Sequence, residues 1–210
     1  MTDLEKAAPP LPPAAPTPAE ALADLLAGNH RFVTNTRLHP HQDAEHRAAL
    51  ATAQRPFAVL FGCSDSRLAA EIIFDRGLGD LFVVRTAGHI VGPEVLASIE
   101  FGVAVLGAPL VVVLGHEDCG AVKAAESALG GAHAPDNLRP IVDGVLPSVR
   151  AAHADGVTDY IGMADIHVRH TAAAVAKAGS VVDAVAAGRC AVVGMSYWLA
   201  EGRVSVVAPL

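Results

Sequence analysis

The chain has 210 residues, of which 52% are hydrophobic, and it carries 15 Lys and Arg against 22 Asp and Glu, a net charge of -7. This length suits one well-buried domain, and the negative charge without a basic stripe argues against a nucleic-acid partner. The cysteine count of 3 does not fit a disulfide framework and indicates a reducing compartment, so we expect a cytoplasmic protein. Because no apolar run reaches the ~20 residues that cross a bilayer, we expect no membrane partner.

The N-terminal part of the sequence divides into a tail and a helical arm. Residues 1–17 are rich in proline, which favours neither helix nor sheet, and we expect a disordered tail there. Residues 18–33 predict an amphipathic helix that starts at Pro18 and carries Leu22, Leu25 and Leu26 on one stripe. A second helical stretch is expected over 43–54, which completes an N-terminal helical arm over 18–54.

In the rest of the chain, short apolar runs alternate with helical stretches. Strands are expected over 56–62, 81–85, 110–115, 190–194 and 203–207, the last antiparallel at an edge. Helices are expected over 92–108, 159–177 and 180–187. This alternation predicts a single α/β domain over 18–210, with a mainly parallel, doubly wound sheet of four parallel strands plus an antiparallel edge strand, flanked by helices.

Two of the expected strands end in side chains that can bind a metal. The sequence CSDSR (63–67) follows the first strand, and GHEDCGA (115–121) follows the third. Ligand sites in parallel sheets collect at the carboxyl ends of strands, and neighbouring strands lie about 5 Å apart. If these strands are neighbours, Cys63, His116 and Cys119 can converge on one ion. Two thiolates and one imidazole favour zinc, and three protein ligands leave a fourth position for water, as in catalytic sites.

The plainer interpretation of Cys63, His116 and Cys119 is that they are ordinary core residues, but it leaves the neighbouring Asp65 and Arg67 unexplained. Cys190 opens a buried strand and is interpreted as core packing. Eight other histidines lie in polar stretches and lack the spacing of metal ligands, and we expect them at the solvated surface. They are His30, His39, His41, His46, His133, His153, His167 and His170.

The two motifs together resemble those of the β-class carbonic anhydrases, and the similarity extends through LAGNHRFV, FVVRTAGHIV, SIEFGVAVLGAPLVVVLGH and GMSYWLAEGRV. The resemblance implies Zn2+ held by Cys63, His116 and Cys119, and reversible hydration of carbon dioxide to bicarbonate and a proton by a zinc-bound hydroxide. It also implies a homodimer or tetramer in which the N-terminal helices wrap around the partner. The apolar stripe of residues 22–33 would then be exposed in the single chain.

The resemblance also implies roles for residues around the metal. Asp65 would accept a hydrogen bond at the metal or, in a closed state, become its fourth ligand, and Arg67 would hold Asp65 away through a bidentate pair. The implied substrate contacts are Gln54, contributed across the dimer interface, together with Phe82, Ala87 and Phe101. By periodicity alone, Phe82 and Phe101 would be core residues and Gln54 a surface residue.

Two other functions remain open at this point. A carbon disulfide or carbonyl sulfide hydrolase would use the same metal chemistry and differ only in substrate access. A non-catalytic zinc-binding dimer would need the ligands, but it would not need Asp65 and Arg67 beside them. A redox role for the thiols is not favoured, because the sequence has no C-x-x-C motif.

Overall fold

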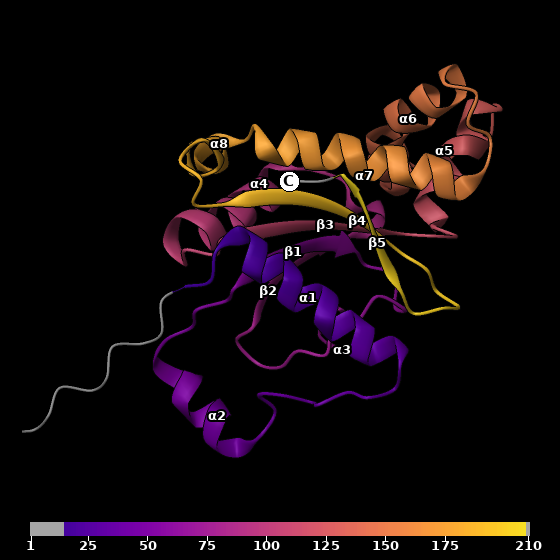
Figure 1. The fold of residues 1–210 in the computed structure, drawn as a ribbon. Helices are drawn as coiled ribbons and strands as arrows, with labels where there is room; N and C mark the ends of the chain where they lie inside the picture. Colours follow the sequence, from indigo (N-terminus) through magenta and orange to yellow (C-terminus); the bar gives the residue numbers. More distant parts are fainter. Residues whose placement is uncertain (1–14, 209–210) are drawn as a thin grey trace, which may run out of the picture.

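The structure is a computed structural model that describes residues 15–208, so most of the expected tail over 1–17 lies outside the described residues. Figure 1 shows a central sheet with helices above and below it. In chain order the helices and strands are α1 (Pro18–Val33), α2 (Ala44–Ala49), β1 (Ala58–Cys63), α3 (Ala70–Ile73), β2 (Leu81–Thr86), α4 (Pro93–Glu100), β3 (Leu110–His116), α5 (Gly120–Leu129), α6 (Arg139–Ala154), α7 (Tyr160–Ala176), α8 (Gly179–Ala186), β4 (Ala191–Tyr197) and β5 (Val204–Ala208).

The sheet has 5 strands in the order β2-β1-β3-β4-β5. β1 pairs in parallel with β2 and with β3, and β3 pairs in parallel with β4. β5 pairs antiparallel with β4 at the edge. The predicted arrangement of four parallel strands and an antiparallel edge strand is therefore confirmed. Because β1 and β3 are direct neighbours, their carboxyl ends lie side by side.

The two central strands are buried on both faces, which is the usual environment of a parallel sheet between helical layers. Successive side chains of a strand point to opposite faces. In β1, Val59 and Phe61 belong to the core that includes α4, the end of α7, and α8. Leu60 belongs to the core on the other face, which α1 and α3 cover. α5 and α6 pack together beyond the end of β3 (Figure 1).

α1 packs against the sheet of its own chain. Thr17 accepts a hydrogen bond from the Glu20 N–H and donates its own N–H to the Glu20 carboxylate, a capping box that starts the helix as expected. The expected exposure of the apolar stripe was wrong for Leu25, which is 0% exposed, because the stripe covers the chain's own sheet.

Residues 34–54 project away from the sheet and the helices that cover it (Figure 1). In place of one helix over 43–54, the structure has the short α2, which buries no residue, followed by a 3-10 turn over Leu50–Thr52. Further along the chain, the expected helix over 92–108 is α4 continued by a π-helical turn over Phe101–Val105.

α6 was not predicted from the sequence. Its first turn contains a proline, which suits a helix start. Pro147 lies inside the helix and argues against a helix when read locally. Its buried residues Val142, Val145 and Val149 nevertheless repeat with helical spacing. Across residues 15–208, every helix is too short or too polar to serve as a membrane span.

Candidate metal centre

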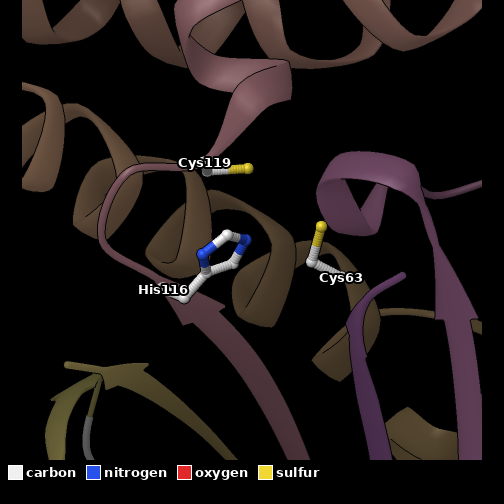
Figure 2. Close-up of side chains that lie close together, drawn as sticks. All are labelled: Cys63, His116 and Cys119. Carbon is white, nitrogen blue, oxygen red and sulfur yellow. The ribbon is translucent and has the colours of Figure 1, made fainter. Parts of the chain in front are cut away.

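Three side chains with metal-binding atoms gather at the carboxyl ends of β1 and β3. Cys63 ends β1, His116 ends β3, and Cys119 is the residue before the first turn of α5. All three are buried, and their sulfur and ring nitrogen atoms lie within 4.8 Å of one another. Figure 2 shows both thiols and the imidazole turned toward the same point. The predicted convergence of these three residues is therefore present in the structure.

The imidazole of His116 is held in the orientation that a metal ligand needs. Its Nδ1 lies 2.7 Å from the carbonyl oxygen of Glu117, and because a carbonyl only accepts, Nδ1 carries the proton. Nε2 therefore presents a lone pair to the thiols. This atom is buried and has no hydrogen-bond partner within residues 15–208, a situation that costs about 1–3 kcal/mol when nothing compensates it. A metal ion at this point would satisfy Nε2.

The two thiols influence each other's protonation. The pKa of Cys63 is lowered, mainly because the neighbouring Cys119 thiol favours its thiolate form. The pKa of Cys119 is raised, because the neighbouring Cys63 sulfur and burial both favour its protonated form. A cation bound between the two sulfurs would stabilise both as thiolates. The set of two sulfurs and one imidazole nitrogen fits zinc, with tetrahedral room for one further ligand.

Asp65 lies at the rim of this cluster and is held by Arg67. The guanidinium Nε donates to Oδ1 at 2.8 Å and Nη2 donates to Oδ2 at 2.7 Å, a bidentate pair. These bonds keep the pKa of Asp65 well below its usual range, against the opposing effect of partial burial. Oδ2 lies 3.9 Å from Nε2 of His116. The carboxylate is thus charged, close to the ligand atoms, and turned toward Arg67.

Two further residues fix the backbone beside Cys63. Arg85 donates from Nε to the Cys63 carbonyl at 3.0 Å and from Nη2 to the Asp65 carbonyl at 2.6 Å. The N–H of Gly88 donates to Sγ of Cys63 at 3.3 Å. Gly88 adopts φ +65°, in the left-handed region, and a Cβ there would lie 2.5 Å from Cβ of Ala121. We did not single out Gly88 from the sequence, although a glycine just after a strand is a signal for such a turn.

A cavity of about 350 Å³ opens beside Cys63 and Asp65. Its wall includes several apolar side chains, namely Ala87, Ala121, Ala124, Leu138, Ile141 and Val142. Ala87, which the resemblance assigns to the substrate site, does line this cavity. Three wall residues come from α6 or from the turn before it, and sequence reasoning missed them together with that helix.

The other expected substrate contacts do not line this cavity within the single chain. Phe82 and Phe101 pack on each other with ring centroids 6.1 Å apart, and Phe101 is 44% exposed. Gln54 is exposed on the arm, where it lines a separate hollow of about 500 Å³ together with residues such as Leu50 and Leu78. Their role in substrate binding stays a prediction.

Two histidines are buried beneath the metal centre. The expectation that His167 lies at the solvated surface was wrong, because α7 is covered on more than one side and His167 is 3% exposed. Its ring lies 4.4 Å from the ring of His89, which is 1% exposed. Burial lowers the pKa of both imidazoles, so both are neutral. His89 had no assigned role in the sequence.

Comparison with known proteins agrees with this geometry. The sequence matches the carbonic anhydrase family over residues 58–204. Carbonic anhydrase 2 of Mycobacterium tuberculosis is 48% identical over 188 residues, which covers 89% of this chain and 91% of the relative. A carbonic anhydrase of Mycolicibacterium smegmatis is 49% identical over 191 residues, which covers 90% of this chain and 93% of the relative.

Solved structures agree with the sequence relatives. A tetrameric β-carbonic anhydrase of Sordaria macrospora superposes with a TM-score of 0.71 at 25% identity, over 89% of this chain and 96% of that one. A Coccomyxa β-carbonic anhydrase in complex with acetazolamide superposes with a TM-score of 0.69 at 26% identity, over 88% of this chain and 85% of that one. On its sequence, its fold and its cluster of two cysteines and a histidine, this chain belongs to the β-class carbonic anhydrases, a family of enzymes.

Proposed function

We propose that this chain catalyses the reversible hydration of carbon dioxide to bicarbonate and a proton, with Zn2+ held by Cys63, His116 and Cys119. The observation that carries the proposal is the cluster itself, in which two buried thiols face an imidazole nitrogen that has no protein partner within residues 15–208. Relatives that share nearly half of the sequence are named carbonic anhydrases. When bound, zinc makes hydroxide available from water near neutral pH.

Asp65 and Arg67 act as a pair in this proposal. Asp65 is charged and lies 3.9 Å from a ligand atom, so it can accept a hydrogen bond from water or hydroxide that enters the cluster. That bond would orient an oxygen lone pair toward the substrate. Arg67 donates twice to the carboxylate and so opposes its rotation into the cluster, where it would occupy the position that water needs.

The cavity beside Cys63 suits the substrate. Carbon dioxide is small and apolar, and the wall formed by Ala87, Ala121 and Val142 offers it an apolar surface next to the polar cluster. This wall also limits the amount of water near the reacting atoms. The polar contact to the substrate would come from Gln54 of a second copy of the chain, which is why we propose a homodimer or a tetramer. The exposure of Gln54 and Phe101 in the single chain supports this assembly.

We also propose a cytoplasmic location. All 3 cysteines of the sequence are free thiols in the structure, and two of them are assigned to the metal. A reducing compartment would keep them available for that role. Localisation of a tagged chain by cell fractionation tests this part, and recovery from an oxidising compartment would contradict it.

The proposed activity is tested by stopped-flow measurement of carbon dioxide hydration together with the zinc content of the purified protein. Wild-type protein should carry one zinc per chain and hydrate carbon dioxide. Cys63→Ala should lose both properties, because two ligands do not hold the ion. Turnover of carbon disulfide by the same preparations separates the two substrate classes. Hydrolysis of carbon disulfide without hydration of carbon dioxide would refute the proposal, as would full activity of Cys63→Ala.

A further inference from the structure

A row of hydrogen bonds leads from the surface of α7 to the turn beside Cys63. Nδ1 of His170 lies 3.0 Å from Oγ of Ser148, and that oxygen lies 3.0 Å from Nδ1 of His167. Nε2 of His167 lies 2.9 Å from the carbonyl oxygen of Gly88. Ser148 and His167 are 2% and 3% exposed, whereas His170 is exposed. Three side chains from two helices thus form a chain of hydrogen bonds that ends on a single backbone carbonyl.

The direction of each hydrogen bond follows from its partners. The Gly88 carbonyl can only accept, so Nε2 of His167 carries the proton and donates. His167 is neutral, so its Nδ1 accepts, and the hydroxyl of Ser148 donates to it. The Ser148 oxygen then accepts from Nδ1–H of His170. Ser148 therefore selects the tautomer of His167 that can hold Gly88.

Gly88 connects this row to the proposed metal ligand. Its carbonyl is held by His167, and its N–H donates to Sγ of Cys63 at 3.3 Å. Its φ of +65° is in the left-handed region, and a Cβ there would lie 2.5 Å from Cβ of Ala121, so this turn needs a glycine. The ring of His89, the next residue, packs against the ring of His167 at 4.4 Å. The position of the Gly88 N–H is thus coupled to the side chain of His167.

We propose that His167 is a positioning residue for Cys63, acting through Gly88, with Ser148 fixing its tautomer. The inference rests on the proposed function, in which Cys63 is a metal ligand. By holding the Gly88 carbonyl, His167 keeps the Gly88 N–H aimed at the sulfur. Groups that orient metal ligands typically contribute about 10–100-fold to metal affinity. His167 contacts neither the substrate cavity nor the ion in this account, and its effect is on the affinity and the electronic state of the thiolate.

The test compares His167→Leu, which removes the donor and keeps much of the volume, with His167→Gln, whose amide N–H can still reach the Gly88 carbonyl. His153→Leu is the matched control, because His153 is an exposed histidine on α6 whose Nε2 lies 2.8 Å from the Glu126 carboxylate, away from the row of hydrogen bonds. Zinc affinity is measured by competition with a chromophoric chelator. We expect His167→Leu to bind zinc about 10–100-fold more weakly than wild type, the glutamine to restore most of the loss, and the control to match wild type.

The thiolate-to-metal charge-transfer band of the cobalt-substituted protein provides a second readout. Loss of the N–H bond to sulfur should move this band to longer wavelength in His167→Leu and leave it in place in His167→Gln. If His167→Leu does not fold by circular dichroism, Ser148→Ala replaces it, with the same direction of both changes. If the folded variants bind zinc as tightly as wild type and show an unshifted band, this inference is overturned and the proposed function is not affected. Failure of the wild-type chain to bind zinc would overturn the proposed function as well.

Discussion

The turn at Gly88 should not tolerate a side chain, and the structure gives the size of the effect. Its φ of +65° lies in the left-handed region, which costs an L-residue about 1–2 kcal/mol. A Cβ would also lie 2.5 Å from Cβ of Ala121 and 3.3 Å from Cγ2 of Val145, and overpacking of this kind costs about 1–3 kcal/mol. Gly88→Ala should therefore lower the free energy of unfolding by about 2–5 kcal/mol.

Gly156 provides the matched control for this prediction. It has φ +75°, and no other atom lies within 4 Å of the point that a Cβ would occupy, so Gly156→Ala should show the backbone cost alone, about 1–2 kcal/mol. Both variants are compared with wild type by urea denaturation at one protein concentration, because association of chains contributes to apparent stability. If Gly88→Ala loses no more stability than Gly156→Ala, the argument from the close contact with Ala121 is wrong.

Two further predictions concern charged pairs. Arg67→Ala should retain zinc but lose about 10–100-fold of its activity, because Asp65 is then free to enter the cluster. Arg67→Lys has a single donor group, and its activity should lie between those of wild type and Arg67→Ala. Equal activity of all three proteins in stopped-flow assays would contradict the role of Arg67 in holding Asp65 away. Asp75 is buried and accepts from Arg31 Nε at 2.5 Å and from two backbone N–H groups. Asp75→Asn should therefore lower the free energy of unfolding by roughly 1.5–3 kcal/mol at neutral pH. Burial raises the pKa of Asp75, but these hydrogen bonds outweigh burial, and the net shift of its pKa is downward. The stabilisation that the Asp75 carboxylate provides is therefore complete above the unfolded pKa of about 4, and it is lost as pH falls toward the lower pKa of the folded state. Urea denaturation of both proteins between pH 7 and pH 3 should show the difference shrinking only in acid, and a constant difference would refute this assignment.

The cluster of Cys63, His116 and Cys119 could be predicted from the sequence, because residues that follow neighbouring parallel strands lie close together in space. Cys63 and His116 each follow a buried apolar run, and the carboxyl ends of neighbouring parallel strands meet at one edge. The spacing of His116 and Cys119 then needs only a short turn before α5. The same local reasoning recovered the strands and most of the helices to within a few residues.

The errors arose where the surroundings of a helix, which the sequence does not show locally, decide the environment of a residue. His167 lies near the polar residues Asp165, Arg169 and His170 in the sequence, yet α7 is packed against the sheet and against α6. The stripe of α1 has the pattern of an exposed docking face, but it covers the chain's own sheet. α6 was missed because Pro147 argues against a helix, although its apolar residues repeat with helical spacing. Gln54 lies away from the cavity beside Cys63 within one chain, so its proposed contact with the substrate rests on the proposed second chain.

The most direct test of the central claim is a titration of zinc into metal-stripped protein, followed by stopped-flow carbon dioxide hydration. Activity should rise linearly and reach its plateau at one zinc per chain, and Cys119→Ser should show no such rise. Activity in the stripped wild-type protein, or an unchanged titration of Cys119→Ser, would contradict the assignment of the cluster as the catalytic metal site.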